Sequence, residues 1–331
     1  MTNKPRNFKI KNIVLILLSV VFIFYGIGAI IILNSGATIS SVFHGEGVRG
    51  FFRNNFNGHG DSINIDQNES ISLKDISKIS VSTSFSDVKV MYNEESDLKV
   101  ALRGNTRGMM SNNDMELNVN SSNGEVIIKE ISNNGMHNNG MHMNFSDVKL
   151  LLYIPKDYSK AIDISTVSGD MDLSQVDLNT TDMNLNSISG DIEANNINTK
   201  NIGITSKSGS VDINKLISSS LKSSQISGEI NINYFEGAME VETTSGDIEI
   251  KSNKIDGPSK INSISGEVDL YINPNLNLSF DINSVSGDVS VENSLNTSGV
   301  INKSKGSIKI NSGGTAYTVS TTSGDIEIKA N

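Results

Sequence analysis

From about residue 160 to the last residue, apolar and polar positions alternate in short runs, and these runs recur about every 19 residues. A glycine marks each recurrence, in most cases within Ser-Gly-Asp or Ser-Gly-Glu. Successive glycines are separated by 21, 19, 19, 18, 20, 21, 19 and 18 residues. The glycines in register are Gly169, Gly190, Gly209, Gly228, Gly246, Gly266, Gly287, Gly306 and Gly324.

Fixed positions around each glycine carry the apolar side chains. The second and fourth residues after the glycine are apolar in all nine units, and the residue between them is polar. The fifth residue before the glycine is apolar in eight units, and the seventh is apolar in seven. Alternation with a period of two indicates a β-strand with one buried face. Each unit therefore contains two short strands, with the glycine in the turn between them.

A period near 20 residues with strands and no helix is typical of a β-solenoid. The sequence predicts an all-β fold in which about nine rungs of 18–21 residues stack within residues 156–331. Each strand would bond to its copy one rung away, at a spacing of about 4.8 Å. Ser or Thr lies three residues before seven of the nine glycines, which predicts a ladder of stacked hydroxyls. The chain ends soon after the last turn, so we expect an open strand edge that bears Asp325, Glu327 and Lys329.

Residues 76–155 repeat a different pentapeptide. Phe-Ser-Asp-Val-Lys stands at Phe85–Lys89 and again at Phe145–Lys149, each time next to alternating apolar residues. Terminal repeats of a stack are usually atypical. The pattern predicts that residues 76–155 form degenerate first rungs or a capping β-sheet.

The segment Ile13–Leu33 holds 21 residues without a charge, long enough to cross a bilayer as a helix of about 31 Å. Basic residues precede it, so the positive-inside rule places residues 1–12 in the cytoplasm and the repeats outside the cell membrane. A cleaved signal peptide ending near Ser35-Gly36-Ala37 is the alternative, although its apolar part would normally be shorter. Residues 34–75 are rich in Gly, Asn and Ser, which predicts a flexible tether.

Composition narrows the classes of partner. The net charge is −10, and residues 4–11 contribute four positive charges, so the rest of the chain carries −14. This acidic balance argues against nucleic acid as a partner. The chain has no cysteine, so it forms no disulfide and no cysteine–zinc site. It has no tryptophan and few aromatic residues, which weakens the case for sugar stacking. No motif indicates a cofactor, and the oligomeric state is open.

The serial Ser-[Ile/Thr/Val]-Ser-Gly-[Asp/Glu] units, together with Leu150–Tyr158 before them, resemble the bacterial adhesin-like family of β-strand-repeat domains. The resemblance covers about residues 76–331, and the biochemical function of that family is largely unassigned. An N-terminal anchor on such a domain also resembles LiaG-type proteins of envelope-stress operons. The resemblance implies a surface-exposed repeat domain, with an adhesin-like role as one reading.

An acidic residue follows the glycine in seven of the nine units. Stacked carboxylates repel one another, and a hard cation such as calcium between rungs would relieve that repulsion. Capping of the turns and solvation is the alternative, because the calcium-binding nonapeptide of other solenoids is absent. The candidate cation column consists of Asp170, Asp191, Glu229, Asp247, Glu267, Asp288 and Asp325.

Two further sets of residues bear on possible metal binding and catalysis. The tandem pentapeptide in residues 133–143 carries His137, His142 and three methionines, which suit copper or nickel, but an expanded surface loop is the simpler interpretation. All four histidines and every arginine precede the repeats, and the last arginine is Arg107. No convergent set of catalytic residues can be named, so we expect no enzyme activity.

Three functions remain open at this point. The first is a non-catalytic, membrane-anchored surface protein whose repeats contact a cell-wall, protein or other envelope partner. The second is an accessory component of an envelope-stress response that acts by contact with a partner. The third is a glycan hydrolase that uses a pair of the many carboxylates.

Overall fold

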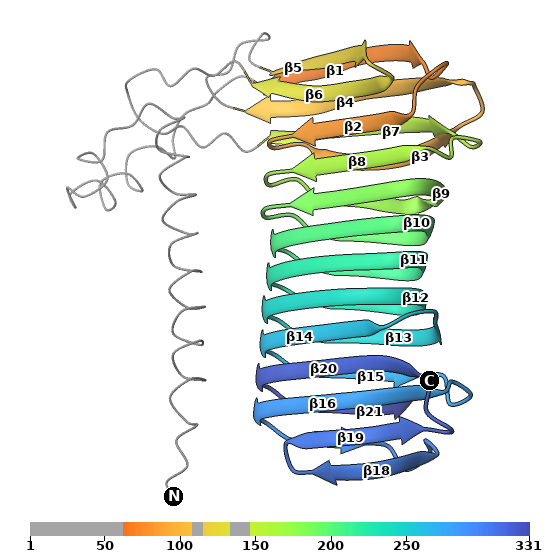
Figure 1. The fold of residues 1–331 in the computed structure, drawn as a ribbon. Helices are drawn as coiled ribbons and strands as arrows, with labels where there is room; N and C mark the ends of the chain where they lie inside the picture. The colour runs from red at the N-terminus through yellow and green to blue at the C-terminus, as the bar shows by residue number, and fades with distance from the viewer. Residues whose placement is uncertain (1–61, 108–114, 133–145) are drawn as a thin grey trace, which may run out of the picture. The chain divides into compact units, whose positions relative to one another are not determined.

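The computed structural model describes residues 62–107, 115–132 and 146–331, and all regular structure in them is β-strand (Figure 1). The prediction of an all-β fold is confirmed. Among these residues there is no helix, and so none with the length and apolarity that a bilayer crossing requires. The predicted membrane segment Ile13–Leu33, the loop of residues 133–143 and all four histidines lie outside the described residues.

The strands follow one another as β1 (Ser62–Ser72), β2 (Lys78–Thr83), β3 (Asp87–Asn93), β4 (Asp97–Arg107), β5 (Met115–Ser122), β6 (Glu125–Ser132), β7 (Ser146–Pro155), β8 (Ala161–Thr166), β9 (Met171–Ser187), β10 (Ile192–Ser208), β11 (Val211–Ser227), β12 (Ile230–Ser245), β13 (Ile248–Ile255), β14 (Ser259–Ser265), β15 (Val268–Ile272), β16 (Leu278–Ser286), β17 (Val289–Val291), β18 (Thr297–Asn302), β19 (Lys305–Ile310), β20 (Thr315–Ser323) and β21 (Ile326–Ala330).

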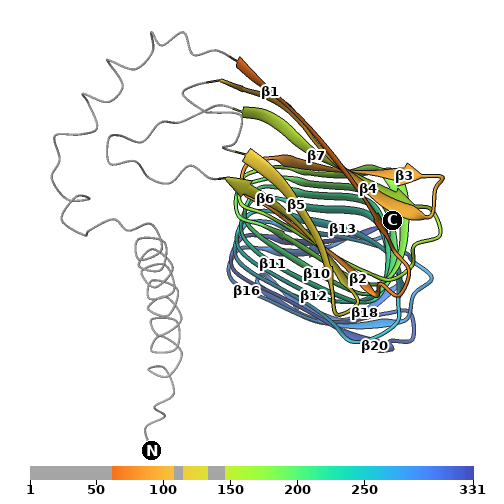
Figure 2. The ribbon, with the colours of Figure 1, turned by 90° about the horizontal axis from the view of Figure 1, so that it is seen from above.

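The central strands β9 to β12 stack in parallel and in register. Ile192 pairs with Met171 on one side and with Val211 on the other, and Val211 pairs in turn with Ile230. We call the strand that enters a glycine turn, the turn and the strand that leaves it a rung, named by its glycine. Figure 2 shows successive rungs lying over one another.

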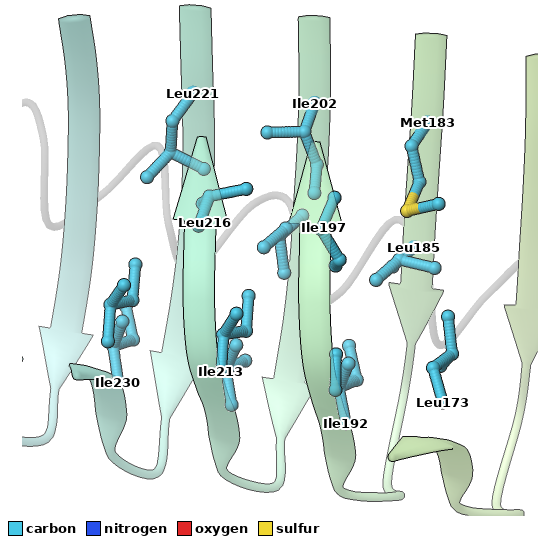
Figure 3. Packing of buried hydrophobic residues seen from close by; sticks show 14 of the residues in the cluster. Leu173, Met183, Leu185, Ile192, Ile197, Ile202, Ile213, Leu216, Leu221 and Ile230 are labelled. Carbon is cyan, nitrogen blue, oxygen red and sulfur yellow. The ribbon is translucent and has the colours of Figure 1, made fainter. Parts of the chain in front are cut away.

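Within the long strands β9, β10 and β11 the inward side changes twice, whereas in β12 it changes once. In β10 the buried residues fall into three groups, which are Ile192 with Ala194, Ile197 with Thr199, and Ile202 with Ile204 and Ser206. Two partly or fully exposed residues in a row separate these groups, and the backbone bends there. The equivalent apolar residues of neighbouring rungs pack against one another inside the stack (Figure 3). The middle group, represented by Ile197, Leu216 and Phe235, was not found in the sequence pattern, because only four of the units carry a large apolar residue there.

The order of rungs in space differs from their order in the chain. Strand β20 lies between β14 and β16, and β21 lies between β15 and β17, all in parallel. The Gly324 rung, which is the last in sequence, is thus inserted between the Gly266 and Gly287 rungs (Figure 1). The predicted open edge at Asp325, Glu327 and Lys329 is therefore wrong, because β21 and its turn lie between two neighbouring rungs. Glu327 pairs with Asp269 and Ser290, and Lys329 pairs with Tyr271.

The prediction that Gly306 marks a turn between two rungs is also wrong. Gly306 lies inside β19, which pairs antiparallel with both β16 and β18. Residues 297–310 form a β-hairpin that covers one strand of the Gly287 rung at the end of the stack. The buried and exposed residues of β19 do alternate, but the strand pairs antiparallel with its neighbours. A periodic glycine pattern alone does not distinguish antiparallel from parallel pairing.

Residues 62–155 form the other end. Strands β2 and β3 make a first rung, with Phe-Ser-Asp in place of Ser-Gly-Asp, and they pair in parallel with β8 and β9. Strands β6 and β7 stack on β2 and β3, and antiparallel partners β5, β4 and β1 complete the cap. The predicted tether extends too far, because Ser62–Ser72 is strand β1, paired along its length with β4.

Candidate functional site

The glycine turns form one column along one side of the stack. Their spatial order is Ser86, Gly169, Gly190, Gly209, Gly228, Gly246, Gly266, Gly324 and Gly287, each against the carbonyl of its neighbour. At Gly246, with φ of +144°, a Cβ atom would lie 1.8 Å from the carbonyl oxygen of Gly228. The turn needs glycine both for its backbone conformation and for this close approach.

The acidic residues after the glycines bond to the neighbouring turns. The Oδ1 atom of Asp170 accepts a hydrogen bond from the backbone N–H of Asp191 at 2.9 Å, and Asp191 accepts one from Ser210 at 2.7 Å. Asp247 accepts from Glu267 at 2.8 Å, and Asp325 accepts from Asp288 at 2.8 Å. These aspartates cap the next turn amide, which explains why Asp, with its short side chain, is favoured there.

The structure brings the predicted cation column together in one line, although in a different order, with Asp325 between Glu267 and Asp288. Four of the seven residues (Asp170, Asp191, Asp247 and Asp325) each give an oxygen to a turn amide. In the described part of the chain no three His, Asp or Glu side chains are grouped as a metal would require. The geometry therefore favours the turn-capping alternative over a cation between rungs.

Some of the buried hydroxyls three residues before the glycines bond within their own turns, whereas those of Thr166, Thr243 and Ser263 have no hydrogen-bond partner among the described residues. Ser187 Oγ donates to the carbonyl oxygen of Gly190 at 2.8 Å, and Thr321 Oγ1 donates to that of Gly324 at 2.9 Å. In the first rung Thr83 Oγ1 donates to the carbonyl oxygen of Ser86 at 3.0 Å. The predicted ladder of stacked hydroxyls is wrong for these residues, because the nearest unpaired acceptor is the turn carbonyl and not the next hydroxyl.

An exposed stripe runs beside the turn column. The residue two before the glycine is apolar in five of the eight glycine rungs, and the residue immediately before the glycine is an exposed serine in all eight. Val167, Ile188, Ile264 and Val285 are 45%, 39%, 38% and 66% exposed. We call the following residues the corner stripe: Val167, Ile188, Ile226, Ile264 and Val285, with Ser168, Ser189, Ser208, Ser227, Ser245, Ser265, Ser286 and Ser323.

On the other side of the turn column lies a strongly acidic face. The first and third residues after the eight turn glycines point outward and include 13 carboxylates in 16 positions. Lysines at the far edge pair with some of them. Lys329 Nζ lies 2.6 Å from Glu327 Oε2 and 3.1 Å from Asp269 Oδ1. Hydrogen bonds to Glu327 and Asp269 raise the pKa of Lys329, so its charge persists at any physiological pH.

The tyrosine nearest to these lysines does not offer a free ring. Lys251 Nζ lies 5.6 Å from the ring centre of Tyr271, and Lys329 Nζ lies 5.4 Å from it. The two lysines belong to the rungs on either side of Tyr271, so a cation faces the ring from both directions. Sugar stacking on Tyr271 would require both lysines to move, which supports the sequence-based doubt about aromatic sugar recognition.

Two open cavities lie among the described residues. One, of about 360 Å³, is lined in part by Asp97, Asp157, Tyr158 and Lys160. Tyr158 donates a hydrogen bond to the carbonyl oxygen of Ala161 at 3.0 Å, and burial raises its pKa, so it remains protonated. The other, also of about 360 Å³, is lined by hydroxyl and amide side chains and one lysine. Neither lining contains a histidine, and neither places a nucleophile against a base.

The comparisons with known proteins concern the repeat region. The family model Toastrack DUF4097 matches residues 76–329. No curated protein matches the chain.

Several solved structures resemble it distantly. A protein provisionally named an adhesin from Bacteroides fragilis is 12% identical, with a TM-score of 0.43, covering 81% of this chain and 97% of its own. A protein provisionally named as lipid-binding from Parabacteroides distasonis is 14% identical, with a TM-score of 0.43, over 82% and 98%. A protein provisionally assigned to cell adhesion from Clostridium sporogenes is 13% identical, with a TM-score of 0.30, over 81% and 100%.

Proposed function

The chain belongs to the Toastrack DUF4097 family, and from that premise we propose that it is a non-catalytic, adhesin-like surface protein. In this proposal Ile13–Leu33 anchors the chain in the cell membrane, with residues 1–12 in the cytoplasm and the stacked rungs outside. The rungs then bind a component of the cell envelope or of a neighbouring cell. Nucleic acid is not a candidate ligand, since the acidic face would repel phosphates.

The corner stripe is the observation that supports this proposal. A soluble protein gains nothing in stability from apolar side chains held in water, yet Val167, Ile188, Ile264 and Val285 repeat at the same place on separate rungs. The serines beside them are all exposed and present hydroxyls at the spacing of the strands, about 4.8 Å. A regular array of apolar groups and hydroxyls suits an extended or repetitive ligand, since each rung repeats the same contact.

The test is a binding measurement with the purified protein and intact envelope material. We expect the triple variant Ile188→Asn, Ile264→Asn, Val285→Asn to lose at least tenfold in affinity, while it keeps the wild-type melting temperature because the side chains are exposed. Thr181→Asn and Ser219→Asn, on exposed positions of β9 and β11 nine residues before the next turn glycine, form the control. Equal loss in both variants, or binding by neither wild type nor variant, would contradict the proposal.

A further inference from the structure

Strand β18 (Thr297–Asn302) leaves one edge of the sheet unpaired at the end of the stack. It pairs antiparallel with β19 along all six residues, and within the described residues no second strand pairs with it. All six of its residues are exposed. The backbone groups on its free edge are therefore available to another strand.

The side chains of β18 do nothing to protect that edge. Its six residues are Thr, Ser, Gly, Val, Ile and Asn, with no charge and no proline. The strands at the other end of the stack differ, because β1 carries Asp66 and Glu69 and β5 carries Glu116. Charged side chains are a common way to prevent pairing at a sheet edge, and β18 lacks them.

Two large apolar side chains lie on this strand in water. Val300 is 63% exposed and pairs across the ladder with Ser307, whereas Ile301 is 41% exposed and lies over Gly306. Because paired residues of an antiparallel ladder share a side of the sheet, Val300 and Ile301 face opposite sides. An added strand would therefore cover apolar surface on both sides of β18.

We propose that β18 pairs antiparallel with β18 of a second copy of this chain, so that two stacks join end to end about a two-fold axis. This inference goes beyond the proposed function and does not depend on it. A two-fold axis places the same uncharged segment on both sides, which is the isologous arrangement common in dimers. An uncharged strand offers no charge that would attract an acidic or a basic segment of another protein. It can pair with its own copy without repulsion between like charges.

The charges around β18 permit this pairing. Lys305 and Lys309 lie on the neighbouring strand β19, so three strand spacings, about 14 Å, separate them from their copies across the axis. That distance exceeds the screening length of about 8–10 Å at physiological salt. Lys303 lies 3.6 Å from Asp288 and is partly compensated. End-to-end contact also keeps the two acidic faces from lying against each other.

Sedimentation of the full chain in detergent, over a range of concentrations, tests the proposal. We expect a reversible dimer for the wild type, and a monomer at every concentration for Val300→Lys, which places a charge on the free strand. Ser307→Lys is the matched control, since it adds the same charge on β19 opposite Val300 and leaves β18 unchanged. This control should still dimerise. A wild type that remains monomeric, or a dimer that survives Val300→Lys, would overturn the proposal.

A second measurement does not depend on the strength of association. The chain contains no cysteine, so a single introduced thiol reports one contact only. Under mild oxidation Val300→Cys should give a covalent dimer, because residues near the centre of a two-fold strand pair lie within disulfide reach. Thr205→Cys, on an outward position far along the stack, should not. Equal cross-linking of both variants would reflect random collision and would count against strand pairing.

Discussion

At the scale of single residues, the turn column is the most constrained part of the molecule. Each turn brings a carbonyl oxygen close to the Cα atom of the next glycine, and Asp170, Asp191, Asp247 and Asp325 each cap a neighbouring amide. Ser86 replaces glycine only in the first rung, where its N–H donates to the buried Glu130 carboxylate at 3.0 Å. Substitutions in this column should therefore lower stability strongly where a side chain would overlap a neighbouring carbonyl, and little where it would not.

Gly246→Ala should lower the free energy of unfolding by more than about 3 kcal/mol, from backbone strain and from overlap with the carbonyl of Gly228. Gly306→Ala is the control. Its Cβ atom would meet nothing closer than 3.5 Å, so we expect a change within about 1 kcal/mol. Urea denaturation measures both. If both variants lose equally large free energies of unfolding, Gly306 would also lie in a turn, and the hairpin would be contradicted.

Two substitutions of Asp191 distinguish the contribution of its hydrogen bond to stability from that of its charge. Asp191→Ala should cost about 1 kcal/mol, because the amide of Ser210 loses its acceptor. Asp191→Asn keeps an oxygen acceptor at the same reach and should cost less than half as much. If both variants instead gain stability, repulsion within the acidic face outweighs the hydrogen bond.

Tyr317 should make the protein sensitive to alkali. Its hydroxyl is fully buried against Met239 Sδ at 3.2 Å, and burial raises its pKa above the usual value of about 10. The unfolded chain then loses this proton at a lower pH than the folded one, so stability is complete below about pH 10 and falls above it. Tyr317→Phe should be within about 1 kcal/mol of wild type at pH 8. It should lose less stability than wild type between pH 8 and pH 11, as measured by urea midpoints, and an equal loss would contradict the assignment.

At the scale of elements, the alternation of apolar and polar residues predicts the individual strands well and the order of the strands poorly. The alternation at Ile192, Ala194, Ile202 and Ile204 reports burial directly, and these side chains are buried as expected. The position of β20 and β21 has no comparable signal. Thr243–Lys251 and Thr321–Lys329 have identical sequences, so either fits beside the Gly266 rung, and the structure places one on each side of it.

The candidate surface was missed for a related reason. Ile188, Ile264 and Val285 stand inside the repeat motif, and an apolar residue in a strand motif is ordinarily assigned to the core. Each of them directly follows a buried serine, so the alternation of the strand continues and turns the apolar side chain outward. The alternation was therefore a usable signal for their exposure, which the coordinates show.

Removal of residues 312–331 tests the inserted rung. The deletion takes away β20 and β21, so β14 and β15 lose partners on one side and β16 and β17 lose partners on the other. We expect hydrogen exchange to show loss of protection throughout β16–β19, as well as faster exchange in β14 and β15. If the rungs instead followed chain order, the Gly266 and Gly287 rungs would keep their protection.

At the scale of the whole molecule, the acidic face sets the response to salt. Thirteen carboxylates in two adjacent columns repel one another, and few lysines lie between them. The parallel hydrogen bonds of the stack and its continuous apolar core oppose this repulsion. The described β-structure should therefore be most stable where mobile ions screen the face.

Raising sodium chloride from about 10 mM to about 300 mM should raise the melting temperature by a few degrees, because the Debye length falls from about 30 Å to less than 8 Å. Calcium chloride at the same ionic strength should give the same rise, since the turn amides occupy the aspartate oxygens. A further increase that only calcium produces would instead show a cation bound between the acidic residues.

The inserted Gly324 rung has a consequence for how the protein is made. Translation delivers β20 and β21 after every other strand, yet they belong in the interior of the stack. Until the ribosome releases them, β14 and β16 each lack the neighbour that β20 provides. Synthesis that stops before residue 312 would thus yield a stack with one rung missing between two others, and a protease can recognise such a gap.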